Sequence, residues 1–364
     1  MSTSPSFQPL DRLDPARFET PAILKKLVSA NRQLAELKGV SRTMPNQGIL
    51  ISTLGLQEAK DSSTIENIVT THDELFRQAA SPDDPSSPAA KEVARYRQAL
   101  NVGFKLVRDS ELLTTNHILD IQATLESSRP GLRKIPGTIL RDNAGRTVYT
   151  PPTPDHLPGL MSDLEHFIND AGKFDTDPLV KMALIHHQFE SIHPFYDGNG
   201  RTGRIINVLY LVRERLLDTP ALYLSRGIVR TKDRYYSLLQ DVRKRDAWEE
   251  WVLYMLETVE LTAAESIATI QVIRDLMLDY KHRIRARHRF YSQDLINNLF
   301  SHPYTRIEFI QQTLDVSRLT ATRYLDALAQ DGFLEKRRIG RANYYINTPL
   351  YQALAGETPP ASNA

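Results

Sequence analysis

The sequence contains no cysteine, which excludes disulfide bridges and thiolate metal sites. It also lacks any run of about 18 apolar residues, so no membrane-spanning helix is predicted. The opening residues MSTSPSFQPLDRLDP have neither a basic start nor an apolar stretch, and they do not resemble an export signal. Together these absences predict a cytoplasmic protein without a membrane partner.

A strong net charge is missing as well, because 45 Lys and Arg residues oppose 44 Asp and Glu residues. The charges are unevenly distributed, since residues 281–345 hold twelve Lys or Arg against six Asp or Glu. A polyanionic partner is therefore expected only near the C-terminus. The basic run Lys281–Arg289 also fits a solvated helix end, and both interpretations stay open.

The 364 residues suit two or three domains, and an apolar content of 41% is enough to give each a core. Apolar residues recur at helical spacing along most of the chain, so the predicted fold is mainly α. One β signal interrupts this pattern at residues 137–150, where two β-prone runs flank Asp142–Gly145 and predict a hairpin. The turn-forming residues 81–88 predict a loop and a domain boundary near residue 90.

Residues 291–346 combine three short helical patterns with two β-prone strands around Ile339-Gly-Arg. The helical patterns are Asp294–Leu299, Ile307–Leu314 and Ser317–Gln330. This order resembles a winged helix-turn-helix domain, which would bind DNA or dock a protein. The predicted organisation is an N-terminal helical region at 1–90, a core at 91–260, a linking helix at 261–289, a winged-helix-like domain at 290–350 and a tail at 351–364.

The densest chemistry lies in His193-Pro-Phe-Tyr-Asp-Gly-Asn-Gly-Arg-Thr-Gly-Arg204. Its glycine spacing fits a dinucleotide-binding fingerprint, but that fingerprint needs a buried strand before the first glycine. Residues 179–192 have the 3.6 period of a helix instead, and no βαβ alternation follows. A Walker loop is excluded because no Lys-Ser/Thr pair closes the glycine run.

The same segment predicts a helix, a tight loop and a second helix that begins near Arg201. Backbone N–H groups of Gly198, Asn199 and Gly200 at that helix start would form an anion-binding nest. Arg201 and Arg204 add donors for phosphate oxygens. The loop is therefore expected to bind a polyphosphate.

The twelve residues match, at every defining position, the pattern His-x-Phe-x-Asp/Glu-Gly-Asn-Gly-Arg-x-x-Arg of the Fic family. A chance match to eight fixed residues is on the order of one in 10⁷. The chain thus resembles a Fic protein, with a helical core and a hairpin flap. The resemblance implies that His193 is the base, Asp197 holds Mg²⁺ and Arg204 meets the γ-phosphate of ATP. The implied nucleotide-binding residues in the motif are Gly198, Asn199, Gly200, Arg201, Thr202, Gly203 and Arg204.

Two further segments extend the resemblance. The hairpin at 137–150 corresponds to the family's flap, where Thr138, Ile139 and Leu140 would align a target segment by main-chain pairing. Tyr235 and Tyr236 fall where family members line the adenosine pocket. A polar amide expected some eight residues later is replaced by Arg243.

Upstream, Ser62-Ser-Thr-Ile-Glu-Asn67 matches the family's inhibitory pattern Ser/Thr-x-x-x-Glu-Gly/Asn. By this resemblance Ser62, Glu66 and Asn67 belong to an inhibitory helix at about 62–70, and Glu66 pairs with Arg204. The alternative is an ordinary helix start, capped by Asp61 or Ser62, with Glu66 as an early-helix carboxylate.

The function implied is transfer of AMP from ATP to a Ser, Thr or Tyr hydroxyl of a protein, with ATP and Mg²⁺ as cofactors. The acceptor would be a target protein or the chain itself, and a homodimer stays open. The alternatives are a nucleotide-sensing DNA-binding regulator, or a Fic enzyme that removes AMP or transfers another phosphate-containing group.

Overall fold

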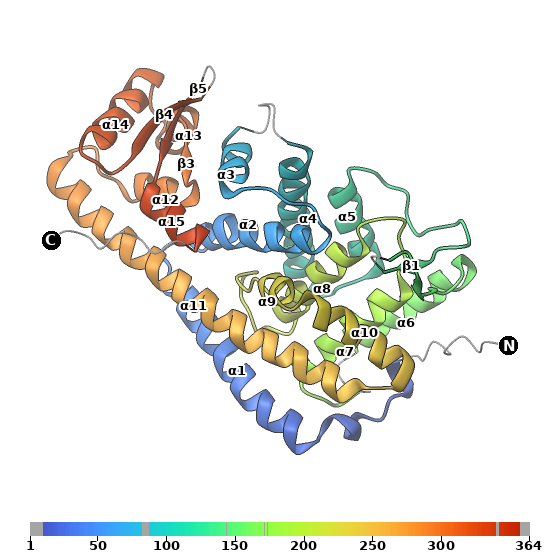
Figure 1. Cartoon of the computed structure of the whole chain (residues 1–364). Coiled ribbons are helices and arrows are strands. Elements are labelled where there is room, and N and C mark those ends of the chain that lie inside the picture. Colours follow the sequence, from blue (N-terminus) through green and yellow to red (C-terminus); the bar gives the residue numbers. More distant parts are fainter. Residues whose placement is uncertain are drawn as a thin grey trace.

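The computed structural model describes residues 10–81, 87–142, 144–170, 172, 174–339 and 342–356, and these residues are mainly helical (Figure 1). The mainly α prediction is therefore confirmed. Several predicted turns and ends lie outside the described residues: positions 1–9, 82–86, Asn143 in the hairpin, Gly340 and Arg341 in the wing, and 357–364. Within the described ranges, no helix has both the length and the apolar character needed to cross a bilayer.

The N-terminal part consists of two 3-10 turns and four helices. They are Leu10–Arg12, Pro15–Phe18, α1 Pro21–Arg42, α2 Gly48–Ile65, α3 His72–Ala80 and α4 Pro88–Ser110. Thr20 caps α1 by accepting a hydrogen bond from the N–H of Ile23, and Pro21 occupies the first helical position, where its missing N–H costs nothing. The apolar face of α1 packs along the long helix α11, Trp248–Arg287 (Figure 1).

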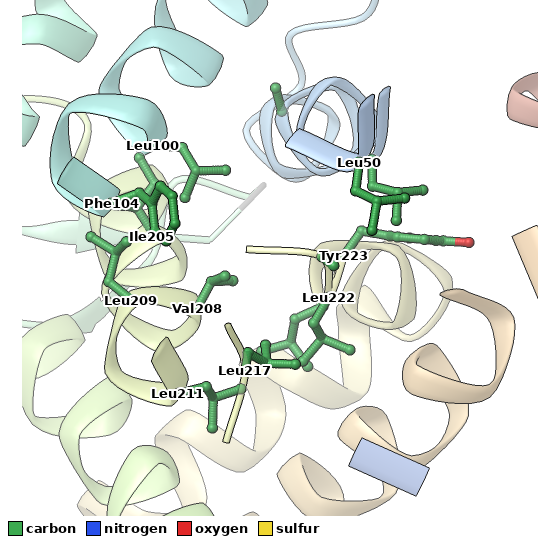
Figure 2. Close-up of a cluster of buried hydrophobic side chains, with 14 of the residues drawn as sticks. Leu50, Leu100, Phe104, Ile205, Val208, Leu209, Leu211, Leu217, Leu222 and Tyr223 are labelled. Carbon is green, nitrogen blue, oxygen red and sulfur yellow. The ribbon is translucent and has the colours of Figure 1, made fainter. Parts of the chain in front are cut away.

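Six helices form the centre of the molecule. They are α5 Thr115–Glu126, α6 Leu157–Asn169, α7 Pro178–Ile192, α8 Asn199–Arg213, α9 Ser225–Arg230 and α10 Lys232–Arg245. Every residue of α7 from Leu179 to Ile192 is buried, so this helix is enclosed on all sides. Figure 2 shows apolar side chains of α8 meeting those of α4. The loop between α7 and α8 is therefore held at both ends by buried helices.

A glycine makes the approach of α4 to its neighbours possible. A side-chain carbon at Gly103 would lie 2.5 Å from Cδ1 of Leu209 and 2.8 Å from Cδ1 of Ile121. Both separations are far below van der Waals contact, so a larger residue would push α4 away from α5 and α8.

The expected hairpin is present between α5 and α6. Strands β1 Leu140–Arg141 and β2 Thr147–Tyr149 pair antiparallel, with Leu140 opposite Tyr149 and Arg141 opposite Thr147. The carboxylate of Asp142 accepts hydrogen bonds from the N–H groups of Ala144 and Arg146, which closes the turn.

The C-terminal unit has the helix and strand order of a winged helix. It contains α12 Gln293–Ser301, β3 Tyr304–Thr305, α13 Ile307–Leu314, α14 Arg318–Gln330, β4 Glu335–Ile339, β5 Ala342–Ile346 and α15 Thr348–Ala355. The sheet is antiparallel in the order β3-β5-β4. Two predicted domain boundaries fall inside helices, since residue 90 lies in the first turn of α4 and residue 261 lies within α11.

The C-terminal unit packs on α2 and α3 (Figure 1). The ring of Phe76 contacts those of Tyr304 and Tyr351, and the side-chain amide of Gln57 donates to the carbonyl of Leu354 at 2.7 Å. On other faces, α2 contacts α4, α8 and α9. Helix α2 therefore lies between the C-terminal unit and the central helices.

Candidate active site

The loop that follows α7 begins with a strained residue. His193 has φ 48°, a left-handed conformation that is uncommon for a residue with a side chain, and its N–H donates to the carbonyl of Phe189 at 3.0 Å. Phe195 is fully buried. The side-chain amide of Asn199 accepts from the N–H of Phe195 and donates to its carbonyl, both at 2.9 Å. The amide of Asn199 thus fixes the shape of the loop.

Two arginines flank the imidazole of His193. Burial, followed by the positive charges of Arg133 and Arg243, lowers the pKa of His193 to about 4. The ring is therefore neutral near pH 7 and has a free lone pair for a proton. The chemical role that the motif implies for His193 matches this protonation state.

Arg133 and Arg243 also attach the hairpin segment to this loop. The guanidinium of Arg133 is buried and donates to the carbonyl of His193 at 2.9 Å. Arg243 lies 3.9 Å over the ring of Tyr149 and donates to the hydroxyl of Ser191 at 3.0 Å. Because residues 133 and 243 lie far apart in the sequence, no local pattern indicated that they would meet at His193.

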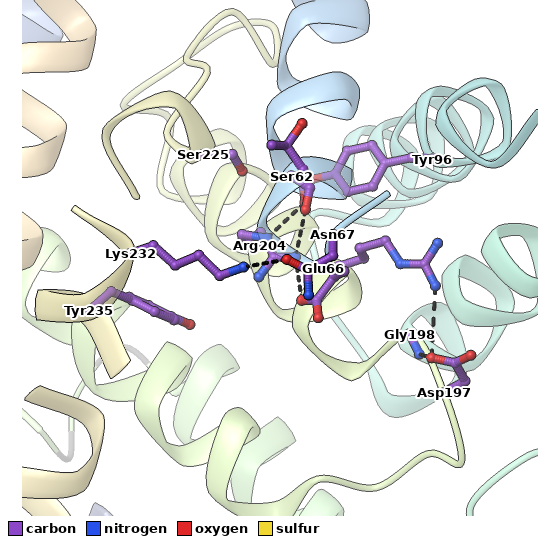
Figure 3. Close-up of polar contacts among 12 residues, drawn as sticks. Ser62, Glu66, Asn67, Tyr96, Asp197, Gly198, Arg204, Ser225, Lys232 and Tyr235 are labelled. Carbon is purple, nitrogen blue, oxygen red and sulfur yellow. Dashed lines mark hydrogen bonds and ion pairs between the residues drawn. The ribbon is translucent and has the colours of Figure 1, made fainter. Parts of the chain in front are cut away.

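The start of α8 has the geometry of an anion site. Gly198 has φ 77° and precedes the first helical residue, Asn199. The N–H of Gly198 donates to the carboxylate of its neighbour Asp197 at 2.7 Å (Figure 3). The unpaired N–H groups at a helix start favour a nearby negative charge. Here the carboxylate of Asp197 accepts a hydrogen bond from one of these N–H groups, that of Gly198.

Asp197 is a suitable ligand for Mg²⁺. Its side chain is 81% exposed and lies beside the helix start, where a nucleotide phosphate would bind. Among the described residues, no group of three or more His, Cys, Asp or Glu side chains could hold a metal ion. Mg²⁺ needs no such group, since it commonly takes one or two carboxylates together with substrate phosphates and water.

Three other motif residues are engaged by protein neighbours. Arg201 forms ion pairs with Glu92 at 3.1 Å and Glu126 at 2.9 Å. Thr202 is fully buried. A side-chain carbon at Gly203 would lie 2.8 Å from the carboxylate of Glu190, so this glycine permits the close contact between α7 and α8.

Arg204 is held by the end of α2. Its Nε donates to the hydroxyl of Ser62 at 2.7 Å, and its Nη2 donates to the carbonyl of Ser62 at 3.0 Å and to Oε1 of Glu66 at 2.8 Å (Figure 3). Burial disfavours the charge of Arg204, yet the carboxylate of Glu66 outweighs that effect and raises the arginine pKa. Burial likewise acts to raise the pKa of Glu66, but Arg204 outweighs it and lowers that pKa.

Glu66 ends a helix and does not start one. Helix α2 closes at Ile65, and the N–H groups of Asn67 and Ile68 donate to the carbonyls of Thr64 and Ser63, both at 3.0 Å. Asn67 has φ 63°, as the residue after a helix end requires in this type of cap. The expected helix at 62–70 and the alternative of a capped helix start are therefore both wrong. Asn67 suits this position, because Gly and Asn adopt a left-handed backbone more readily than other residues.

The carboxylate of Glu66 lies directly against the glycine loop. A side-chain carbon at Gly200 would overlap Oε1 of Glu66 and would come within 3.0 Å of Nη1 of Arg204. Only glycine leaves room for this approach. The carboxylate thus sits at the start of α8, where an anion is favoured.

A second acidic side chain, Glu58, anchors α2 about two turns before Glu66. Glu58 is buried and accepts hydrogen bonds from the hydroxyl of Tyr96 at 3.1 Å and from the N–H of Ser225 at 2.9 Å. Burial raises the pKa of Glu58 to about 7. Glu58, Ser62 and Glu66 are spaced by four residues and share one face of α2, so the anchor fixes the position of the inhibitory pattern. The sequence analysis did not identify Glu58.

The two tyrosines predicted at the adenosine pocket differ in exposure. Tyr235 is 1% exposed, and its hydroxyl lies 2.8 Å from Nε2 of His186. Tyr236 is 40% exposed, and its ring contacts that of Tyr235. Of the pair, only Tyr236 presents a substantial surface to a nucleotide.

Three family models match successive parts of the chain. The Fic/DOC family N-terminal model covers residues 24–105, the Fic/DOC family model covers 112–211, and the C-terminal domain of the SoFic-like protein adenylyltransferases covers 276–350. The first two ranges contain Ser62–Asn67 and His193–Arg204, respectively.

Several known proteins resemble the chain. Protein adenylyltransferase fic-1 of Caenorhabditis elegans is 28% identical over 131 residues, which cover 36% of this chain and 24% of that protein. Its counterpart in Caenorhabditis briggsae is 32% identical over 144 residues, which cover 38% and 27%. The chain thus matches only about a quarter of the length of these relatives.

Solved structures support the fold. A Fic family protein from Desulfovibrio desulfuricans has a TM-score of 0.57 at 21% identity, covering 90% of this chain and 96% of that one. A fragment of Fic-1 from C. elegans has a TM-score of 0.52 at 20% identity, covering 68% and 72%. These likenesses show the fold, and the successive matches of the two Fic/DOC models to residues 24–105 and 112–211 show that the chain belongs to the Fic/DOC family.

Proposed function

We propose that this protein transfers AMP from ATP to the hydroxyl of a Ser, Thr or Tyr residue in a protein. The observation that carries the proposal is a neutral, half-buried histidine beside the start of α8, an anion-binding helix start, with Arg204 in the second turn of that helix. Relatives named protein adenylyltransferases support the same reaction. The match covers a minor part of those relatives, so the activity rests on the site itself.

In the proposed reaction, the acceptor hydroxyl gives its proton to His193 as its oxygen attacks the α-phosphorus of ATP. A bond forms between that oxygen and the α-phosphorus, and the bond from the α-phosphorus to the β-bridging oxygen breaks. Pyrophosphate leaves with the electron pair. The N–H groups of Gly198, Asn199 and Gly200 would bind the negative charge, and Arg204 would bind the γ-phosphate. Mg²⁺ held by Asp197 would neutralise phosphate charge.

We further propose that Glu66 restrains this reaction. Its carboxylate pairs with Arg204 and approaches Gly200, so it competes with phosphate for both. An ATP bound while the pair is intact would lack its γ-phosphate contact and would place the α-phosphorus poorly for attack. Release requires the end of α2 to move away from Arg204.

We propose that the C-terminal unit docks a protein, because it packs on α2 and α3 and because two of its cations are already paired, although Arg323 and Arg338 have no ion pair among the described residues. Within this unit, Arg318 pairs with Glu308 at 2.9 Å and Lys336 pairs with Asp326 at 2.6 Å. Cations that are already paired release few counterions from DNA and add little affinity. The packing of the unit on α2 and α3 supports a role in positioning α2.

The test is incubation of the full chain with ATP labelled at either the α- or the γ-phosphate. We expect covalent label on protein from α-labelled ATP only, and none from either nucleotide in the His193→Ala variant. The matched control is His166→Ala, which removes an exposed histidine on α6. Transfer of γ-label would indicate phosphorylation, and undiminished α-label in His193→Ala would reject His193 as the base.

A further inference from the structure

The segment that covers His193 carries an unusual charge for this chain. Residues 127–150, here called the flap segment, contain five Lys or Arg residues and one Asp, a net charge of +4. The whole chain has a net charge of +1, so the remaining residues sum to −3. Excess positive charge is therefore found on two segments, residues 281–345 and the flap segment, and the flap segment is the one that contacts the loop of the proposed base.

The flap segment is pinned at both ends. At its start, the N–H of Arg133 donates to the carbonyl of Pro194 at 2.9 Å, and the N–H of Lys134 donates to the hydroxyl of Tyr196 at 2.7 Å. At its end, the hydroxyl of Tyr149 donates to the carbonyl of Ser191 at 2.9 Å. These bonds hold the segment in a defined position beside His193.

The five cations divide into two groups. Arg133 is buried against backbone carbonyls, Arg129 pairs with Asp120, and Arg146 pairs with Asp142. Lys134 and Arg141 are exposed. Among the described residues neither forms an ion pair with a carboxylate, and Nη1 of Arg141 donates one hydrogen bond, to the carbonyl of Gly145 at 2.7 Å. Their charges remain available to a partner.

The flap segment also offers apolar side chains and a free strand edge. Ile135 is 67% exposed and Ile139 is 41% exposed. Among the described residues, β1 pairs only with β2, so the other edge of β1 has unpaired backbone groups. A peptide backbone can satisfy such an edge by strand addition, whereas a nucleic acid or a lipid surface cannot.

We propose that the acceptor segment of the target is an extended, acidic stretch of protein with an apolar residue near the modified hydroxyl. Its carboxylates would meet Lys134 and Arg141, its apolar side chain would contact Ile135 and Ile139, and its backbone would pair with β1. The proposal rests on the proposed AMP transfer and specifies which substrates that reaction accepts. Exposed charge pairs are individually weak, so the selectivity should reflect both cations together and fall with added salt.

The experiment uses the full chain carrying Glu66→Gly and α-labelled ATP. The acceptors are two synthetic peptides of equal length with the same hydroxyl and the same isoleucine, flanked either by Asp and Glu or by Lys. We expect kcat/KM for the acidic peptide to exceed that for the basic peptide by about tenfold at low salt. Substituting Lys134→Gln and Arg141→Gln together should remove most of that difference and leave the KM for ATP unchanged.

The matched control is Lys25→Gln with Arg32→Gln, which removes two exposed cations from α1. It should preserve the preference for the acidic peptide. Equal labelling of the two peptides, or a preference that survives loss of Lys134 and Arg141, would overturn the acidic-acceptor inference alone. Self-labelling of the chain without labelling of either peptide would also overturn the acidic-acceptor inference alone. Absence of label on every protein and peptide would instead reject the proposed AMP transfer, on which the acidic-acceptor inference rests.

Discussion

Removal of the Glu66 carboxylate should activate the enzyme, because the hydrogen bond between Glu66 and Arg204 must be broken before Arg204 can bind the γ-phosphate. Glu66 supplies one charge-assisted hydrogen bond at 2.8 Å, and Ser62 supplies the other two bonds to the guanidinium. A hydrogen bond to a charged group contributes about 1.5–3 kcal/mol when buried, and an exposed ion pair contributes about 0–1 kcal/mol. The Glu66 side chain is 35% exposed, so we place its contribution between these two ranges, at about 1.4 kcal/mol. Glu66→Gly should then raise the rate of AMP transfer by at least about tenfold.

The assay is the initial rate of α-labelled AMP incorporation at saturating ATP, compared between wild type, Glu66→Gly and Glu66→Gln. The glutamine variant keeps the size of the side chain and loses its charge, so its rate should lie between the other two. Glu36→Gln, which changes an exposed glutamate of α1, controls for loss of a negative charge elsewhere. Arg204→Ala should be slow whether or not Glu66 is present. A Glu66→Gly rate equal to or below wild type, with ATP still bound, would refute the inhibitory role.

Three further predictions address other parts of the site. Asp197→Ala should abolish Mg²⁺-dependent transfer, and a wild-type rate that is unchanged in chelator would contradict this. For Arg243→Met, the acid limb of the kcat/KM profile should move upward from about pH 4, because loss of the cation removes one of the effects that lower the pKa of His193, which accepts protons only when neutral; an unmoved limb would mean that burial and Arg133 set this pKa. Duplex DNA should bind no more than weakly, whereas tight, salt-sensitive binding that weakens and loses part of its salt dependence in Arg318→Ala with Arg323→Ala would support the regulator alternative.

The sequence alone predicted features that depend on local patterns. The 3.6 period through residues 179–192 placed a helix before the motif, and the β-prone runs around Asp142–Gly145 located the hairpin. The winged-helix order was also readable, because its helices and strands are short and separated by polar turns. These elements are set by periodicity and turn chemistry within about 15 residues.

The sequence predicts the end of α2 poorly, because Asp61 and Ser62 are residues that commonly start helices. In the structure both residues lie in the last turns of α2, which begins at Gly48. Asn67 was the available signal, because Asn followed by an apolar residue commonly closes a helix in a left-handed conformation.

The surroundings of His193 could not be predicted because they are made by long-range packing. Arg133, from the flap segment, donates to the carbonyl of His193, and Arg243, from α10, donates to the hydroxyl of Ser191, although 110 positions separate the two arginines in the sequence. The pairing of Arg201 with Glu92 and Glu126 likewise joins three helices. Such contacts depend on how α4, α5 and α10 pack around α7 and α8, and no single-segment pattern encodes that arrangement.

We propose that His193 drives AMP transfer and that Glu66 restrains it. Intact-mass measurement of the full chain after incubation with Mg·ATP tests both roles. We predict AMP adducts on Glu66→Gly in clear excess over wild type, and none on Glu66→Gly combined with His193→Ala, although the double variant should still bind ATP. Adducts that persist without His193, or a mass gain equal to phosphate in place of AMP, would contradict the account.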